Sequence, residues 1–153
     1  MTGAHDRLAE LGLELPPVTP PVAAYVPAVQ TGNHVYVSGQ VPVADGKLLA
    51  SGKVGAEVNS EEAKELARRC ALNALAAVDA LVGLDRVVRV VKVVGFVASA
   101  SGFTGQPGVI NGASELFGEV FGPAGQHARS AVGVAELPLG APVEVEAIFE
   151  VSG

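Results

Sequence analysis

The chain has 153 residues, a formal net charge of -6 at pH 7 and 49% hydrophobic residues. The length predicts one domain, and the hydrophobic content excludes a disordered chain. A protein that binds the phosphate backbone of nucleic acids needs clustered Lys and Arg, so the acidic balance argues against nucleic acid as a partner.

Cys70 is the single cysteine, which excludes an internal disulfide and every metal site built from several cysteines. It lies within a helical apolar pattern, so we expect a buried, inert thiol rather than a nucleophile. The N-terminus lacks the apolar stretch of a secretory signal, and the longest apolar run, 87–98, is too short to cross a membrane. These features predict a soluble cytoplasmic protein that binds no membrane.

The N-terminal segment, residues 1–21, is predicted to form a short helix and a proline-rich connector. Residues 4–11 place apolar side chains on one side of a helix that ends at Gly12. Four prolines between positions 16 and 21 then force an extended connector. We expect residues 22–153 to form the domain itself, and the segment before it carries no motif for chemistry.

Two strands are predicted next, over residues 25–30 and 34–41, joined by a favoured Gly-Asn reversal. Ser38 and Gly39 interrupt the alternation of the second strand. This interruption has two interpretations, a bend whose backbone contacts a ligand and a bulge without function. The pattern alone favours neither.

A long helix is the clearest element, because Asn59 can cap its start and Gly83 suits its end. A β-branched run over residues 87–98 then predicts a central strand. Pro107 suits the first turn of a second helix, which Gly122 ends.

The C-terminal end, residues 129–151, is predicted to form two paired strands joined at residues 137–140. On the first strand, Arg129, Ala131 and Gly133 share one face. One long cation followed by two residues with almost no side chain leaves an opening where a small anion could lie against the sheet.

Three polar side chains are candidates for chemistry, and each has an alternative role. Arg129 could clamp an anion or form an ion pair at the surface or between subunits. Glu144 could activate a water molecule or lie exposed on its strand, and Asn111 could reach a ligand or be solvated. In a hairpin with about 3.3 Å per residue, Arg129 and Glu144 lie roughly 20 Å apart. A second copy of the chain must then supply one of them if both serve one small ligand.

The element order β-β-α-β-α-β-β predicts an α+β fold, with two helices on one face of a single mixed sheet. The other face is rich in Val and needs covering, which suggests self-association. The sequence has no Gly-rich phosphate loop and no nucleophile elbow, and His5, His34 and His127 are scattered along it. We therefore expect no cofactor and no metal.

Several segments resemble the Rid (YjgF-like) family of reactive-intermediate deaminases, also labelled the endoribonuclease L-PSP family. They occur in the family's order and span most of the chain after residue 22. The closing combination of Ala-Arg-Ser, Leu-Pro and Val-Glu-Val-Glu-Ala-Ile is quite specific. The segments are 24–33, 37–42, 111–117, 128–130, and 137–138 with 143–148.

The resemblance implies a chorismate-mutase-like fold, a homotrimer with a barrel-like core, and ligand clefts between subunits. It also implies hydrolysis of 2-imino and 2-enamino acids to 2-keto acids and ammonia without a cofactor. Arg129 matches the family arginine that holds the substrate carboxylate, and Glu144 matches the acidic residue near the attacking water. The positions that line the cleft are matched by Tyr25, Ser38, Gly39 and Asn111.

Two positions depart from the family pattern. Ala131 stands where many members have Cys, and His127 stands where the usual residue is Pro. Both changes reshape the expected substrate pocket, and with it the substrate preference. One alternative function is a non-catalytic module that binds a small carboxylate at the same clefts. Another is a ribonuclease, which the acidic balance opposes.

Overall fold

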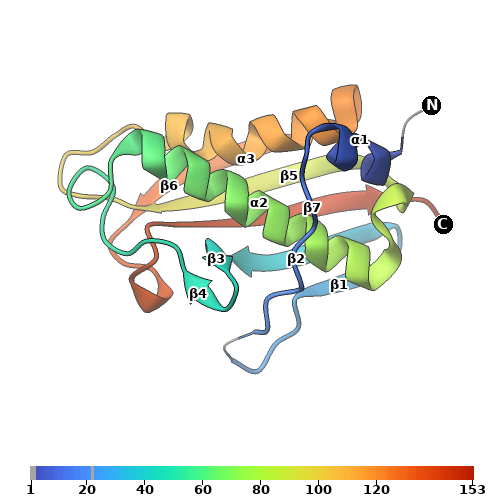
Figure 1. The fold of residues 1–153 in the computed structure, drawn as a ribbon, viewed down its shortest axis with the longest axis horizontal. Coiled ribbons are helices and arrows are strands. Elements are labelled where there is room, and N and C mark those ends of the chain that lie inside the picture. The colour runs from blue at the N-terminus through green and yellow to red at the C-terminus, as the bar shows by residue number, and fades with distance from the viewer. Residues whose placement is uncertain (1–2, 22) are drawn as a thin grey trace.

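The computed structural model describes residues 3–21 and 23–153. A five-stranded mixed sheet, in the order β1-β2-β7-β5-β6, carries helices on one face (Figure 1). β5 and β6 are parallel, and the other neighbouring strands are antiparallel. The strands are β1 (Ala28–Thr31), β2 (His34–Gln40), β5 (Val87–Ala98), β6 (Ala128–Val134) and β7 (Val143–Val151). The predicted α+β fold with one mixed sheet is confirmed.

The first long helix, α2 (Ser60–Val82), begins and ends where the sequence predicts. The side-chain oxygen of Asn59 accepts the backbone N–H of Glu62 at 2.8 Å, which satisfies one of the free donors of the first turn. Gly83 follows the last turn with a φ of 90°, a left-handed conformation that favours glycine.

The second long helix, α3 (Gln106–Phe121), has Pro107 in its first turn and ends before Gly122, also as predicted. It packs directly on α2 at Gly112. A Cβ atom added there would overlap the backbone carbonyl oxygen of Lys64, so a larger residue would push the two helices apart.

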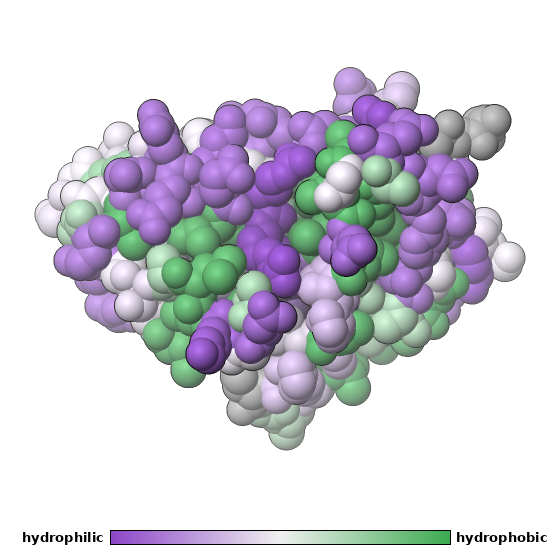
Figure 2. All heavy atoms as spheres, viewed as in Figure 1, coloured by the Kyte–Doolittle hydropathy of each residue, from purple (hydrophilic) through white to green (hydrophobic). Residues whose placement is uncertain are grey.

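The hydrophobic core lies between these helices and the sheet. Phe117 of α3 and Phe149 of β7 are fully buried, and their rings meet edge to face with centroids 5.6 Å apart. Cys70 is also fully buried, and burial raises the pKa of its thiol well above the ordinary value. The predicted burial of this thiol is therefore confirmed. Hydrophilic side chains cover much of the outer face of the helical layer (Figure 2).

A short helix, α1 (Ala4–Glu10), lies where the sequence predicts one, and it is anchored on the helical layer beside α3 (Figure 1). Leu8 is only 3% exposed within the core, and Arg7 Nε donates to the backbone carbonyl of Glu119 at 2.7 Å. The proline-rich connector then runs from this anchor toward β1.

The predicted hairpin of the two C-terminal strands is wrong. β5 lies between β6 and β7, so that Arg129 is paired with Val93, and Val93 with Ala147. The physical reason is that α3 carries the chain back along the sheet, and a strand after such a crossover lies parallel to the strand before it. The separation of Arg129 and Glu144 estimated along one hairpin therefore does not apply.

Shorter elements fill the connections. Asp45 and Gly46, with φ of 53° and 77°, turn a small extra hairpin of β3 (Val43–Ala44) and β4 (Lys47–Leu48). Three short 3-10 turns are η1 (Leu84–Arg86), η2 (Gly122–Gly125) and η3 (Pro138–Gly140).

The face of the sheet opposite the helices leaves apolar side chains exposed. Val29, Tyr36 and Ile148 are neighbours there on three adjacent strands. Val29 and Tyr36 are 53% and 44% exposed, and Val132 on β6 is 44% exposed. A row of exposed apolar side chains across a sheet is typical of a surface that another protein covers.

Candidate functional site

Arg129 lies on β6, at one edge of the sheet, and its side chain turns toward α3. Its Nη1 donates to the side-chain oxygen of Asn111 at 2.8 Å and to the hydroxyl of Ser114 at 3.2 Å. Its Nη2 donates to the backbone carbonyl of Pro107 at 3.2 Å. Across residues 3–21 and 23–153, no carboxylate forms an ion pair with it. Neutral acceptors orient this guanidinium, and its charge remains available to an anion.

A further hydrogen bond joins Ser114 to His127. The Nε2 atom of His127 lies 2.9 Å from the Ser114 hydroxyl, and its Nδ1 atom lies 2.6 Å from the carbonyl oxygen of Gly125. Because a carbonyl oxygen can only accept, Nδ1 carries the proton and donates to it. In the neutral imidazole, Nε2 then accepts the Ser114 hydroxyl proton, which leaves the Ser114 oxygen to accept from Arg129.

Glu144 lies on β7 and points to the opposite face of the sheet. Its neighbours Val143 and Val145 are buried under the helices, so the alternation of the strand directs Glu144 away from them. Burial raises the pKa of the Glu144 carboxyl above its ordinary value, and the nearby Glu146 adds to the rise. A carboxylate in this environment is a stronger base than an exposed one.

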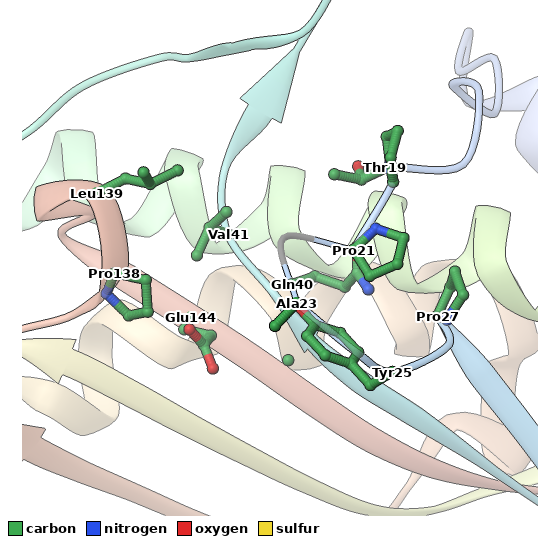
Figure 3. Close-up of a pocket in the computed structure, with 12 residues that line it drawn as sticks. Thr19, Pro21, Ala23, Tyr25, Pro27, Gln40, Val41, Pro138, Leu139 and Glu144 are labelled. Atoms are coloured by element: carbon green, nitrogen blue, oxygen red, sulfur yellow. The ribbon is translucent and has the colours of Figure 1, made fainter.

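A cavity of about 420 Å³ opens beside Glu144 (Figure 3). Pro138 and Leu139 stand on one side of it, and Pro21, Ala23 and Tyr25 stand on the other. The residues that line it are Thr19, Pro20, Pro21, Ala23, Tyr25, Pro27, Gly39, Gln40, Val41, Pro138, Leu139 and Glu144.

The structure divides the seven predicted site residues into two groups. Tyr25, Gly39 and Glu144 line the cavity, and Ser38 precedes Gly39 where β2 is irregular. The Ser38 hydroxyl donates to the backbone carbonyl of Val26 at 2.6 Å, so its bonding is local. The strand bulges there and Gly39 lines the cavity, and a ligand contact at this bend stays a prediction.

The second group is Arg129, Asn111 and Ala131, on the side of the sheet that carries the helices. The sequence predicts an opening over Ala131 and Gly133, and at Gly133 this is wrong. A Cβ atom at Gly133 would lie 2.8 Å from Gln106 Nε2 and 2.9 Å from the Ser99 hydroxyl, so these side chains fill the space. Within one chain, the sheet itself separates the two groups.

Sequence reasoning gave no signal for several residues of these sites. Ser114 lies three residues after Asn111 on one helix face, a spacing that could have connected it to Arg129. Pro20, Pro21 and Leu139 line the cavity without belonging to any motif. Leu139 stands out in the structure because its φ is 64° and its side chain is 68% exposed.

Residues 3–21 and 23–153 lack two features. They contain no helix long and apolar enough to cross a membrane. They also contain no cluster of three or more His, Cys, Asp or Glu side chains arranged to hold a metal ion.

Comparisons with known proteins place the fold among close relatives. The protein TCP17 of Trypanosoma cruzi is 46% identical over 148 residues, which are 95% of this chain and 92% of that protein. A crystal structure of Atu1372, a protein of unknown function from Agrobacterium tumefaciens, is 46% identical, with a TM-score of 0.90. That match covers 97% of this chain and 92% of the other.

A crystal structure of E. coli TdcF with bound serine is 26% identical, with a TM-score of 0.64. That match covers 90% of this chain and 94% of TdcF. A family model described as endoribonuclease L-PSP matches residues 17–151, and the motifs in the sequence are those of the same family. The chain therefore belongs to the endoribonuclease L-PSP (Rid/YjgF-like) family.

Proposed function

We propose that this protein hydrolyses 2-imino and 2-enamino acids to 2-keto acids and ammonia, at clefts shared by two copies of the chain. The proposal rests on the orientation and the hydrogen bonds of the Arg129 side chain. Its guanidinium is held in one orientation by Asn111, Ser114 and Pro107 and has no carboxylate partner among the described residues. Such a group is prepared to bind the carboxylate of a small organic acid.

We place the cleft between copies because one chain cannot assemble it alone. Arg129 and Glu144 lie on opposite faces of the sheet, so a small substrate cannot touch both in a single protomer. The apolar row of Val29, Tyr36 and Ile148, of which Val29 and Tyr36 are exposed, gives a second copy a surface to bind. In the homotrimer that we propose, Arg129 of one copy meets Glu144 of the next.

The chemistry requires an anchor, a water molecule and a base. Arg129 binds the substrate carboxylate through paired N–H donors, which fixes the imine carbon relative to the water. Glu144 accepts a proton from the water as the oxygen attacks that carbon, which gives a tetrahedral carbinolamine. A proton then passes to the nitrogen, the carbon–nitrogen bond breaks, and ammonia and the 2-keto acid leave. An enamine first takes a proton on carbon and becomes the imine.

Two observations support this division of roles. The raised pKa of Glu144 suits a group that must accept a proton and later return it. TdcF, which shares the fold, binds serine, a small molecule with a carboxylate next to a carbon–nitrogen bond.

The test is ammonia release from freshly generated 2-iminobutyrate, corrected for spontaneous hydrolysis. We expect wild type to accelerate release and Arg129→Ala to lose about a hundredfold or more in kcat/KM, because the carboxylate anchor is gone. Arg89→Ala, which removes an exposed arginine on β5, is the matched control and should keep its activity.

The same measurements decide between the alternatives. Equal rates for wild type and Arg129→Ala, with oligomer and 2-oxobutyrate binding retained in wild type, would identify a non-catalytic module that binds small carboxylates. Ribonuclease activity that co-purifies with the protein and disappears in Arg129→Ala would support the activity that the family description names. The histidine bonding opposes ribonuclease activity, because His5 is hydrogen-bonded to Asp79 and His127 to Ser114, and these two histidines are not bonded to each other.

A further inference from the structure

The cavity beside Glu144 has the properties of a pocket for an apolar side chain. Seven of its lining residues are Pro, Ala, Val or Leu, and Glu144 is the single charged side chain among the described residues of the lining. An apolar cavity of roughly 150 Å³ is enough to bind benzene. At about 420 Å³, this cavity therefore has room for a branched or aromatic side chain in addition to the reacting carbon.

One wall of the cavity comes from the connector that precedes β1. Pro20 and Pro21 face the cavity, and proline has a fixed φ, so this wall loses little conformational freedom when a ligand binds. The start of the connector is held in place by Leu8 in the core and by the hydrogen bond from Arg7 to the Glu119 carbonyl. These features reduce the ordering that the wall requires when a ligand binds.

The opposite wall contains Leu139, whose conformation is costly. Its φ of 64° and ψ of 10° place a branched side chain in the left-handed region, which glycine occupies more easily. The side chain is nevertheless 68% exposed and lines the cavity. A strained residue that presents apolar surface to solvent at a cavity mouth indicates a contact that the free protomer lacks.

From these observations we infer that the cavity selects 2-imino acids with bulky apolar side chains, branched aliphatic or aromatic. This inference rests on the proposed function, because it places the reacting carbon at Glu144 and directs the substrate side chain between Leu139 and the Pro20–Pro21 wall. Substrates with short side chains leave the cavity hydrated. Substrates with a negative charge on the side chain meet no cation among the described residues that one chain contributes to the lining.

Binding of the product 2-keto acids tests the pocket independently of turnover. Isothermal titration calorimetry should give a Kd for 4-methyl-2-oxopentanoate and for phenylpyruvate at least about tenfold lower than for 2-oxobutyrate, because each buried methylene in an apolar pocket contributes severalfold. We expect 2-oxoglutarate to bind more weakly than 2-oxobutyrate. In the imine assay, kcat/KM should follow the same order.

Two variants test whether the two walls of the cavity cause the selectivity for bulky apolar side chains. Leu139→Gly removes one wall and relieves the positive φ, so it should fold normally while the ratio of Kd values for 2-oxobutyrate and phenylpyruvate falls about threefold or more. The double variant Pro20→Gly, Pro21→Gly loosens the other wall and should reduce the ratio as well. Leu49→Ala is the matched control, because it truncates a leucine that is 51% exposed and outside the cavity.

Failure of the inference differs from failure of the proposed function. If 2-iminobutyrate is hydrolysed well but the Kd values are equal across the series, the selectivity is absent and the hydrolase remains. Alternatively, no imine is hydrolysed, but phenylpyruvate binds tightly and Leu139→Gly weakens this binding. In that case the pocket has the inferred selectivity and the proposed hydrolysis is wrong. If Leu139→Gly dissociates the oligomer without changing the ratio, Leu139 is a contact between copies and the inference is wrong.

Discussion

Gly39 and Glu144 share one small space at the base of the cavity. A Cβ atom added at Gly39 would overlap the Glu144 carboxylate, so the glycine on β2 allows the carboxylate of β7 to lie across it. The bulge in β2 next to Gly39 and the raised pKa of Glu144 are therefore features of one arrangement. The position of the proposed base depends on a residue that has no side chain.

Gly39→Ala should displace Glu144 and leave the fold nearly intact. The overlapping atoms belong to the end of a flexible side chain, which can move aside at little loss of stability. A shift of the base by about 1 Å can lower the rate about a hundredfold, so we expect kcat/KM to fall by about ten- to a hundredfold. Ammonia release and thermal unfolding measure the two effects.

The control for this substitution is Gly118→Ala on the exposed face of α3. An added Cβ atom there meets no other atom within 4 Å, and alanine stabilises a helix by up to about 1 kcal/mol relative to glycine. This variant should keep full activity. An active Gly39→Ala protein would contradict the proposed position of the base.

The ends of the long helices could be predicted from the sequence, and the pairing of β6 could not. The caps at Asn59 and Gly83, and Pro107 at the start of α3, are local signals, and both helices begin and end as predicted. The pairing of β6 is not local, because it depends on the crossover through α3. Reading β6 and β7 as a hairpin consequently gave the wrong neighbours.

The candidate site shows the same limit. Alternation along β7 predicted the face of the sheet on which Glu144 lies. It did not predict which residues surround Glu144 on that face. The proximity of Asn111 to Arg129 was expected from the family resemblance. Ser114 was marked only by its spacing of three residues from Asn111, and Leu139 had no signal. The proline wall of the cavity could not be predicted, because it depends on where the connector lies after the domain has folded.

Glu144 should make the protein less stable as the pH rises. Its pKa in the folded state lies above the ordinary value of 4.5, so the folded state holds the proton more tightly than the unfolded state. Its contribution to stability is therefore fully present below about pH 4.5 and is lost as the pH rises through the folded-state pKa. Denaturant unfolding from pH 4 to 8 should show a smaller decline for Glu144→Gln than for wild type.

Ionisation of Glu144 should increase the rate of the proposed reaction, although it lowers the stability of the fold. Only the ionised carboxylate can accept a proton from water, so kcat/KM should rise with pH to a plateau, with a midpoint above 4.5. Glu144→Gln should lower the plateau by about a hundred- to ten-thousandfold and abolish the rise. If kcat/KM of Glu144→Gln still rises with pH as in wild type, the titrating group is not Glu144.

His127 should act on Arg129 through Ser114. His127→Ala removes the acceptor that orients the Ser114 hydroxyl, and it also removes the edge contact with Phe117, whose ring centroid is 6.1 Å away. We expect KM to rise about threefold to tenfold with little change in kcat, because the affected group anchors the substrate carboxylate. Loss of the aromatic contact should lower the free energy of unfolding by about 1 kcal/mol.

A second substitution separates positioning from stability at this histidine. In His127→Gln, the side-chain amide can restore a hydrogen bond to Ser114 while the ring contact with Phe117 stays absent. KM should return toward the wild-type value although the protein remains destabilised. If both variants raise KM equally, the effect comes from packing alone.

Mixed oligomers test whether two copies complete each site. Arg129→Ala and Glu144→Gln are each expected to be nearly inactive alone, but the first retains Glu144 and the second retains Arg129. In oligomers reassembled from equal amounts of both, a shared cleft contains one intact residue from each copy in about a quarter of cases, by random combination of subunits. Activity should recover to about a quarter of wild type.

The control is reassembly of either variant with the double variant Arg129→Ala, Glu144→Gln, which can form no intact cleft. If Arg129 and Glu144 instead served one site within a single chain, no mixture would regain activity, because every chain would lack one of the two. The position of the two residues on opposite faces of one sheet makes recovery the expected result. Exchange that is confirmed by native mass spectrometry, with no recovered activity, would refute a shared cleft.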